Sequence, residues 1–380
     1  MEWQVPLSDL SYGEEEYRAA LDVLESGWLT MGAVTERFER AFAECLGGRH
    51  AIAVSNATAA LHVANLVLGV GPGDEVIVPS LSFVATANAV KYANATPVFA
   101  DIRGEEDLCI SPEAIRAKIT PRTKAIVVMH YGGYMCDMPA ILAIAKEHDL
   151  TVIEDAAHAP GAELNGKKAG TWGEIGCFSF FSNKNLVTGE GGMIVTDRDD
   201  LAEQMRLLRS HGMTSLTWDR HRGRAHSYDV VALGYNYRID ELRSALGLVQ
   251  LEKLADNNRR RRTISEHYRS ELAKLGFLSL PHSSHPGLSA AHLFPVLLDP
   301  GAERQGFIKS MHARGIQTSV HYPPIHQFSL YRQDGGSPYL PTTEQIALRE
   351  VTLPLYPTMN DAQVELVINS VESELARVAP

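Results

Sequence analysis

The feature that most constrains the fold of this chain is an alternation between short apolar runs and helix-like segments over its first two hundred residues. Turn residues bound the apolar runs, as they commonly bound strands. Most runs are apolar almost throughout, which is typical of strands covered on both faces. The runs occupy 51–55, 75–79, 96–101, 124–129, 151–155, 176–181 and 193–196, and the helix-like segments between them include 57–68, 84–93, 112–118 and 138–148.

This alternation predicts an α/β fold with a mostly parallel central sheet flanked by helices. Past about residue 240 the pattern changes to a long helical stretch followed by turns and a mixture of strands and helices. We therefore predict two domains, a large α/β domain over 1–250 that includes the N-terminal segment, and a smaller α+β domain over 251–380. The elements expected after residue 238 are a helix at 239–273, a strand near 291–298, a helix near 301–314, a strand near 316–321 and a helix near 360–377.

Four consecutive basic residues, Arg259 to Arg262, lie inside the expected long helix. Consecutive residues point in different directions around a helix. We therefore interpret this run as a solvated or interface face rather than as a binding patch.

The overall charge and the cysteines exclude several classes of protein. A net charge of −11 argues against general binding of nucleic acid, which leaves a basic footprint. The first residues do not form a basic region followed by an apolar stretch, and no apolar run is long enough to span a bilayer. We expect no membrane segment and a cytoplasmic protein. Because the four cysteines are scattered, we also expect free thiols and no disulfide framework or metal site.

Three segments carry residues suited to chemistry, and each follows a predicted strand, where open α/β sheets place their ligands. The first is TVIEDAAHAPGA at 151–162. Its Asp155, flanked by small residues, could approach a flat ring and hold a pyridine nitrogen protonated. The alternative is that Asp155 caps a helix, a role that aspartate often fills.

The second segment is CFSFFSNKNLVTGEGGMIVT at 177–196. Its Lys184 lies on a turn between two predicted strands. A lysine that is partly desolvated there can have a free amine near neutral pH and act as a nucleophile and a base. The alternative is a solvated loop lysine.

The third segment is AVSNATAALHVA at 53–64. Here Ser55, Asn56 and Thr58 lead from a strand into a helix, whose first N–H groups can bind a phosphate. These residues could also serve only as a helix cap. Taken together, the three segments offer a phosphate site, a partner for a ring nitrogen and an imine-forming lysine, which are the groups that pyridoxal 5'-phosphate (PLP) requires.

With these residues in place, the chain resembles the DegT/DnrJ/EryC1/StrS sugar aminotransferases, which are fold-type I PLP enzymes similar to aspartate aminotransferase. The resemblance covers nearly the whole chain, and its most specific motif is FSFFSNKNLVTGEGG. Other matching stretches are SGWLTMGAVTERFE at 26–39, LGYNYRIDELRSALG at 233–247 and VHYPPIH at 320–326.

The resemblance implies a role for each matching residue. Lys184 is similar to the lysine that forms the Schiff base, Asp155 to the partner of the pyridinium nitrogen, and His158 to the residue beside the 3-oxygen of the cofactor. On its own, His158 would be read as a hydrogen-bonded structural histidine.

Further matches concern the ring and the phosphate of the cofactor. Phe83 is similar to the aromatic residue that stacks on the ring, although an isolated phenylalanine would be assigned to the core. Asn236 is similar to a residue that reaches the phosphate from the partner subunit, which implies a homodimer with active sites at its interface; alternatively, Asn236 caps the helix beginning near Ile239. The residues that match phosphate contacts are Thr58, Ala59 and Ser179.

The implied reaction transfers the amino group of L-glutamate to a nucleotide-linked keto-sugar, with the cofactor alternating between PLP and its amine form, PMP. Histidine at position 158 rather than glutamine favours a 4-keto-6-deoxy sugar. Trp28, His321 and Tyr322 are candidates for binding the substrate. The amino-sugar product would serve surface polysaccharide such as lipopolysaccharide O-antigen, or the glycosylation of a natural product.

The chain departs from the family pattern at two positions. Ala57 replaces a common glycine in the phosphate turn, which would be costly if that position required a positive φ angle, and Ser182 replaces a common proline. Three alternative functions stay open: a cyclitol aminotransferase, a dehydratase of the same family, and a non-catalytic regulatory protein. The dehydratase branch has a histidine where this chain has Lys184.

Overall fold

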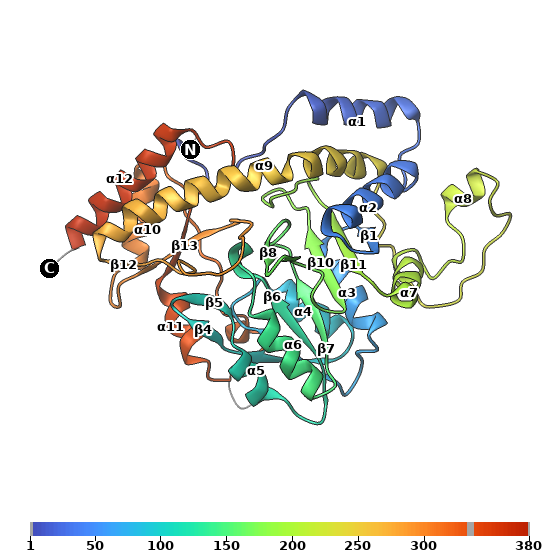
Figure 1. Ribbon diagram of the computed structural model, residues 1–380, viewed down its shortest axis with the longest axis horizontal. Coiled ribbons are helices and arrows are strands. Elements are labelled where there is room, and N and C mark those ends of the chain that lie inside the picture. The colour runs from blue at the N-terminus through green and yellow to red at the C-terminus, as the bar shows by residue number, and fades with distance from the viewer. Residues whose placement is uncertain (1–2, 333–337, 379–380) are drawn as a thin grey trace.

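The computed structural model describes residues 3–332 and 338–378. At its centre lies a seven-stranded sheet with the order β1-β11-β10-β7-β6-β2-β3 (Figure 1). Strand β11 is antiparallel to both of its neighbours, and every other neighbouring pair is parallel. The predicted mostly parallel α/β sheet is therefore confirmed. Its strands are β1 (His50–Val54), β2 (Glu75–Pro79), β3 (Thr96–Ala100), β6 (Thr123–Met129), β7 (Thr151–Asp155), β10 (Ile175–Ser179) and β11 (Gly192–Thr196).

Helices cover both faces of this sheet, because the strand residues that point to each face are apolar. In β1, Ala51 and Ala53 belong to the core on one face, whereas Ile52 and Val54 belong to the core on the other. The first core is closed by α2 (Ala33–Leu46), α5 (Pro112–Lys118) and α6 (Met138–Glu147), and the second by α3 (Ala57–Val67), α4 (Ala85–Tyr92) and α7 (Asp199–Arg209).

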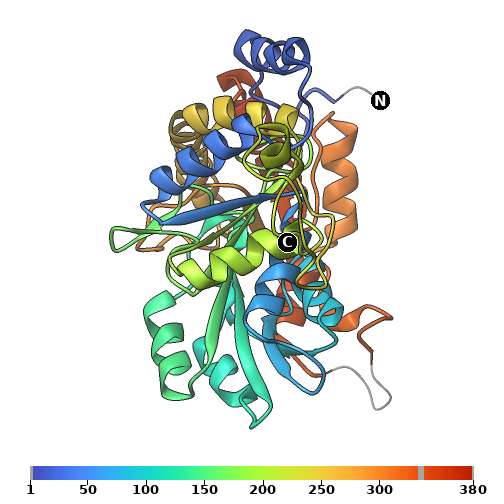
Figure 2. The ribbon, with the colours of Figure 1, turned by 90° about the vertical axis from the view of Figure 1, so that its right-hand side faces the viewer.

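The longest helix, α9 (Glu241–Leu272), connects the sheet to the C-terminal part of the chain. The side chain of Asp240 caps its N-terminus by accepting from the backbone N–H of Arg243. Along its length α9 contacts α1, α2 and α12, and two views at right angles show α1 lying along α9 on the outside of the molecule (Figures 1 and 2).

The C-terminal part contains a three-stranded antiparallel sheet with its own core. The strands are β12 (Leu278–Ser279), β13 (Phe294–Leu298) and β14 (Glu350–Leu353), and the helices are α10 (Arg304–Ala313) and α12 (Asp361–Val378). Tyr268 of α9 and Val5 of the N-terminal segment pack into the same core. A division of the chain at residue 250 therefore falls inside α9, and the two-domain assignment stays a prediction.

One expected element is absent from the described residues, and several present elements were not expected. Residues 316–321 do not form a strand; only isolated bridges pair Ile316 with Val5 and Ser319 with Thr352. Only Ile316 and Val320 are apolar in this stretch, and it runs as a loop between Val5 and Thr352 without pairing along a ladder. The remaining elements are α1 (Glu14–Ser26), β4 (Ile102–Gly104), β5 (Asp107–Ile110), β8 (Glu163–Leu164), β9 (Lys167–Lys168), α8 (Thr217–His221), α11 (Pro341–Arg349) and the short 3-10 helices Tyr131–Gly133, Ala273–Leu275 and Ile325–Gln327.

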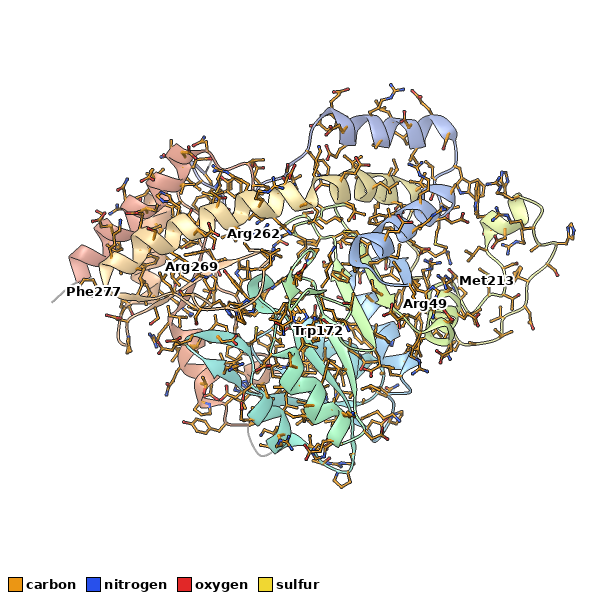
Figure 3. The ribbon with its side chains drawn as sticks, in the orientation of Figure 1. Arg49, Trp172, Met213, Arg262, Arg269 and Phe277 are labelled. Carbon is orange, nitrogen blue, oxygen red and sulfur yellow. The ribbon has the colours of Figure 1, made fainter. Side chains whose placement is uncertain are left out.

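The run Arg259 to Arg262, expected to be a solvated or interface face, contacts the C-terminal part of the chain through three of its four residues. Arg261 is 3% exposed and donates to the carbonyl of Leu355 at 2.7 Å. Arg262, labelled in Figure 3, donates to the carbonyl of Ser289, and Arg260 donates to that of Met359. These guanidinium groups satisfy backbone carbonyls of the C-terminal part and fix α9 against it.

Two expectations about the whole chain can be compared with the structure. No helix in the described part is both long and apolar enough to cross a membrane. All four cysteines are free thiols, three of them buried, as expected from their spacing.

Candidate active site

The predicted site residues converge at the edge of the central sheet where its parallel strands end. Strand β7 ends at Asp155 and β10 at Ser179, and residues 180–191 then connect β10 to β11 and contain Lys184. Strand β1 leads through Ser55 and Asn56 into α3, and β2 leads through Phe83 into α4. Because these strands run in the same direction, their ends lie at one edge, and the three segments are brought together there.

Asp155 is buried, with 4% of its surface exposed, and it accepts two hydrogen bonds. The hydroxyl of Thr86 donates to its Oδ2 at 2.7 Å, and the backbone N–H of Ala157 donates to its Oδ1 at 3.2 Å. Burial raises the pKa of Asp155, although these hydrogen bonds and the charge of Lys184 oppose the shift. A turn rather than a helix follows Asp155, so the helix-cap alternative does not apply.

Lys184 is not a solvated surface lysine, because it is only partly exposed and its charge acts on the pKa values of Asp155 and His158. Its backbone N–H donates to the carbonyl of Phe181 at 2.9 Å, which fixes the turn. Burial lowers the pKa of Lys184 to about 8, and the charge of Asp155 opposes that shift. A substantial fraction of the amine is therefore neutral near physiological pH, as a nucleophile or base requires.

The residue after the lysine, Asn185, anchors the loop, and the sequence did not single it out. Its Nδ2 donates to Oδ1 of Asn258 on α9 and to the carbonyl of Ala290, at 2.8 and 2.7 Å. Its Oδ1 lies 2.9 Å from Nδ1 of His292. These buried contacts join the lysine loop to the long helix and to the segment before β13, so Lys184 is held from three directions.

His158 lies in a row of rings beside the lysine. Its Nε2 is 2.9 Å from the hydroxyl of Tyr322, and its ring centroid is 4.3 Å from that of His292. Burial, together with the charge of Lys184, lowers its pKa well below the usual value, so the ring is neutral. Phe83 lies on the other side of Tyr322, with ring centroids 6.0 Å apart.

Phe83 itself is 56% exposed and does not belong to the core. A large aromatic side chain that faces an open edge among polar groups is suited to cover a flat ligand. The alternative of an ordinary core phenylalanine is therefore wrong.

His321 and Tyr322 lie beside this row of rings, on the segment between α10 and the 3-10 helix Ile325–Gln327. The backbone N–H of His321 donates to Oε2 of Glu350 at 2.8 Å, and its Nδ1 is 2.9 Å from Oγ1 of Thr352. The structure thus brings both residues to the edge that carries Asp155 and His158.

The start of α3, where the phosphate site is expected, has a geometry that removes the doubt about Ala57. Ala57 is the first residue of the helix and does not have a positive φ angle, so the missing glycine causes no backbone strain. The side chain of Asn56 caps the helix by accepting from the N–H of Ala59 at 2.8 Å. The N–H groups of Ala57 and Thr58 have no partner within the described ranges, as is usual in the first turn of a helix.

Strands β10 and β11 lie next to the start of α3. Ser179, at the end of β10, pairs in register with Gly192 of β11. A Cβ atom at Gly192 would lie 2.6 Å from the carbonyl carbon of Asn56 and 2.8 Å from the nitrogen of Ala57. Only glycine therefore allows β11 to approach the helix start so closely.

The residues at this edge fit PLP. The free N–H groups at the start of α3, with the hydroxyls of Thr58 and Ser179, suit a phosphate. The lysine amine with a lowered pKa suits an aldehyde, and the buried carboxyl of Asp155 suits a ring nitrogen.

Two predicted residues lie away from this cluster within the chain. Trp28 packs against Trp218 and His221 of α8, with ring centroids 4.9 and 4.5 Å away, and its Nε1 is buried without a partner in the part of the chain that the structure describes. Asn236 is exposed and bridges to Ser210. It does not cap α9, because Asp240 does.

The residue before Asp155 also has a demanding structural position. Glu154 is fully buried and accepts from the backbone N–H groups of Gly170, Trp172 and Gly173 at 2.6–2.8 Å. Its Oε2 is 2.9 Å from Nε2 of His130. Burial disfavours charge on this histidine, but contacts with Cys136 and Glu154 raise the pKa of His130 to about 10. The carboxyl group of Glu154 holds the loop after β9 in place. Of the adjacent Glu154 and Asp155, only Asp155 therefore faces the site.

A separate cluster has the residue types of a metal site. Ligand atoms of Asp107, Cys109 and His282 lie within 4.8 Å of one another. However, Nε2 of His282 accepts from the N–H of Leu108, so a neutral ring carries its proton on Nδ1, the atom nearer Asp107. That tautomer leaves no lone pair for a cation on Nδ1.

The fold and this edge define a fold-type I enzyme, and comparison with known proteins specifies the family. The model of the DegT/DnrJ/EryC1/StrS aminotransferase family matches residues 11–372. The chain belongs to this family. The membership confirms the expected class, a PLP-dependent sugar aminotransferase.

Solved structures of other aminotransferases are similar to this chain over nearly its whole length. The aminotransferase TlmJ from Streptoalloteichus hindustanus is 36% identical, with a TM-score of 0.91 over 99% of this chain and 100% of that one. PseC of Helicobacter pylori, an aminotransferase involved in the biosynthesis of pseudoaminic acid, is 32% identical, with a TM-score of 0.90 over 99% and 100%. Spr1654 of Streptococcus pneumoniae in its PLP-form is 27% identical, with a TM-score of 0.91 over 100% of both chains, and it also has a PMP-form.

Proposed function

We propose that this protein transfers the amino group of L-glutamate to a nucleotide-linked keto-sugar, with a 4-keto-6-deoxy sugar as the acceptor. The observation that carries the proposal is the convergence of Lys184 and Asp155 at one buried edge of the sheet, where the charge of each acts on the pKa of the other. The similarity to aminotransferases that include an enzyme of pseudoaminic acid biosynthesis supports a sugar as the acceptor.

In this proposal PLP, when bound, supplies an electron-withdrawing ring that stabilises negative charge at the carbon losing a proton. Asp155 holds the proton on the ring nitrogen. Its burial and its bonds from Thr86 and Ala157 fix the carboxyl group in position. Lys184 would hold the cofactor through its amine, and the same amine would move the proton at Cα of the amino donor. The lowered pKa of its amine suits both tasks.

The other residues of the edge orient the cofactor and the substrates. With the cofactor bound, His158, held by Tyr322, would contact its 3-oxygen, and Phe83 would cover one face of its ring. His321 and Tyr322 bind substrate at this edge, and we propose the same role for Trp28, which packs against α8 away from the cluster of its own chain. Thr58, Ala59 and Ser179 hold the phosphate; since the N–H of Ala59 already serves the Asn56 cap, the Thr58 hydroxyl and the free N–H groups before it are the stronger ligands.

We further propose a homodimer in which each subunit completes the site of the other. Asn236 is exposed and lies outside the cluster of its own chain, which suits a residue that reaches the partner's phosphate. We also place the enzyme in the cytoplasm, because its four free cysteines suit a reducing compartment. The product would serve surface polysaccharide such as lipopolysaccharide O-antigen, or natural-product glycosylation.

The experiment that tests this function is the visible absorption spectrum of the PLP-loaded protein before and after L-glutamate is added. We expect the band of lysine-bound PLP to convert to that of PMP, and a nucleotide-linked 4-keto-6-deoxy sugar to restore it with formation of an amino-sugar detectable by mass spectrometry. Lys184→Ala should remain folded and show neither change.

Other outcomes separate the alternatives. Conversion by glutamate with restoration only by a keto-inositol would identify a cyclitol aminotransferase. A spectrum unaffected by glutamate, with loss of a sugar hydroxyl, would favour a dehydratase. Failure to hold PLP after reconstitution would favour a regulatory protein.

A further inference from the structure

A chain of hydrogen bonds leads from the active-site edge into the interior of the C-terminal sheet. Nδ1 of His321 lies 2.9 Å from Oγ1 of Thr352, and that oxygen lies 2.5 Å from Oε1 of Glu350. The second carboxyl oxygen, Oε2, accepts from the backbone N–H of His321 at 2.8 Å. Thr352 and Glu350 are 1% and 0% exposed. Because the inner end is closed to solvent, protons can reach this carboxyl through the side chains of Thr352 and His321.

The outer end of this chain is the Nε2 atom of His321; within the described ranges the hydrogen bonds of the His321 backbone N–H and ring are those to Glu350 and Thr352. His321 lies close enough to Lys184 for the charge of the lysine to act on it. Burial, and then that charge, lower the pKa of His321 to about 4. The ring is therefore neutral at physiological pH and carries one proton, on either Nδ1 or Nε2.

The number of protons along the chain fixes which nitrogen carries it. If Glu350 is ionised, the hydroxyl of Thr352 donates to the carboxylate and accepts from Nδ1–H of His321, so Nε2 is bare. If Glu350 is protonated, it donates to Thr352, Thr352 donates to Nδ1, and Nε2 carries the proton. The same three side chains therefore have two arrangements that differ by one proton.

We propose that His321, Thr352 and Glu350 form a proton relay that gives a proton to a substrate oxygen in the active site and later takes it back. The inference rests on the proposed amination of a keto-sugar, whose carbonyl oxygen leaves as water and must gain protons. In the delivery step the N–H bond at Nε2 breaks and an O–H bond forms on that oxygen. Thr352 passes its proton to Nδ1, and Glu350 passes its proton to Thr352 and becomes a carboxylate. In the opposite half of the cycle, where water is consumed, the same transfers run in reverse.

The surroundings of Glu350 set the pH range in which the relay is loaded. Burial raises the pKa of Glu350 to about 8, and the charge of Arg304 opposes this shift together with bonds from Thr352 and His321. Tyr131 and Tyr322 also face the carboxyl, whose charge contributes to raising their pKa values. A group with a raised pKa holds its proton below that pH, so the relay is loaded below about pH 8 and empty above it.

The primary test is nuclear magnetic resonance of the full-length protein with isotope-labelled histidine ring nitrogens, without substrate. The His321 signals are assigned by their loss in His321→Gln. We expect Nε2 to carry the proton well below pH 8 and to lose it well above that pH. Thr352→Ser, which keeps the hydroxyl, should retain this change, and Thr352→Val, which has the same shape without the hydroxyl, should lose it.

A matched control is Thr318→Val, because the buried hydroxyl of Thr318 has no hydrogen-bond partner within the described residues. In turnover assays we expect Thr352→Val to lose about 100-fold in kcat, as for loss of a general acid. Thr352→Ser should recover most of the activity, and Thr318→Val should resemble wild type.

The relay would be overturned if the ring proton of His321 stays on the same nitrogen across pH 8 in wild type. It would also be overturned if Thr352→Val shows the same change of tautomer as wild type. Either result would hold even if a keto-sugar is aminated. Conversely, absence of turnover with keto-sugars alongside the expected tautomer change would overturn the proposed acceptor and leave the relay in place. Because Lys184 titrates in the same range, the ring-nitrogen signal rather than the pH–rate profile decides the question.

Discussion

Burial acts on Asp155 and Lys184 in opposite directions. Removal from water raises the pKa of the carboxyl and lowers that of the amine, so desolvation favours the neutral form of both. Their mutual attraction opposes both shifts. This balance leaves an amine that can react near neutral pH and a carboxyl that gains from a positively charged partner, which a protonated ring nitrogen provides.

The lowered pKa of Lys184 predicts how capture of the cofactor depends on pH. Only the neutral amine attacks an aldehyde, so the rate at which PLP binds to cofactor-free protein should rise with pH and reach half its maximum near pH 8. Stopped-flow absorbance measures this rate. A half-maximum near pH 10.4, the value of an ordinary lysine, would show that the amine is not desolvated.

At the scale of single residues, the sequence identified the reacting groups but not the residues that hold them in place. Asp155 and Lys184 are residue types suited to the chemistry, whereas Asn185 and Glu154, in the same two segments, act through contacts with residues elsewhere in the chain. No local pattern marks an asparagine whose partners are Asn258 and Ala290. The cap alternatives for Asp155 and Asn236 and the core alternative for Phe83 failed, because tertiary structure decided each one, whereas Asn56 does cap α3.

At the scale of elements, the apolar runs predicted the strands of the central sheet within one or two residues, because strands covered on both faces read as continuous apolar segments. The C-terminal sheet was harder to predict. Strand β14 begins with Glu350, whose carboxyl group is fully buried. Because this first residue is polar, the strand does not match the apolar pattern that predicts buried strands. Residues 316–321 meet Val5 and Thr352 only through isolated bridges, so the strand expected there does not form.

The contact between β11 and the start of α3 gives a prediction about cofactor binding. Gly192→Ala places a methyl group within 2.6 Å of the backbone of Asn56, so the helix start must move away from Ser179. We expect the Kd for PLP to increase at least about tenfold, which corresponds to about 1.4 kcal/mol, when measured by equilibrium dialysis.

Gly71→Ala is the matched control, since its Cβ would meet no atom within 4 Å and its φ angle is not positive. Unchanged affinity in Gly192→Ala would mean that the phosphate does not depend on this close approach.

At the scale of the whole molecule, three apolar residues near Asn236 are exposed in the single chain. Leu233 is 87% exposed, Val230 56% and Val231 55%. Apolar residues clustered in this way indicate a protein–protein contact, and the homodimer proposed above would bury them.

Substitution of Leu233 tests that contact. We expect wild type to sediment at about twice 41.7 kDa and Leu233→Asp to shift toward monomer with loss of activity, because a charge in an apolar interface is costly. Leu348→Asp, on α11 with 70% exposure, is the control and should stay dimeric. A wild-type monomer with full activity would contradict shared active sites.

The antiparallel placement of β11 has a consequence for how this enzyme acquires its reactive centre during folding. Ser179 and Gly192 pair directly, so the loop with Lys184 is closed by two strands adjacent in sequence, whereas parallel neighbours must await a longer crossover. Closing a short loop costs little chain entropy and is fast. We expect the hairpin that holds the amine to form early, and the carboxyl of Asp155, which needs the β7–β10 crossover, to join it later.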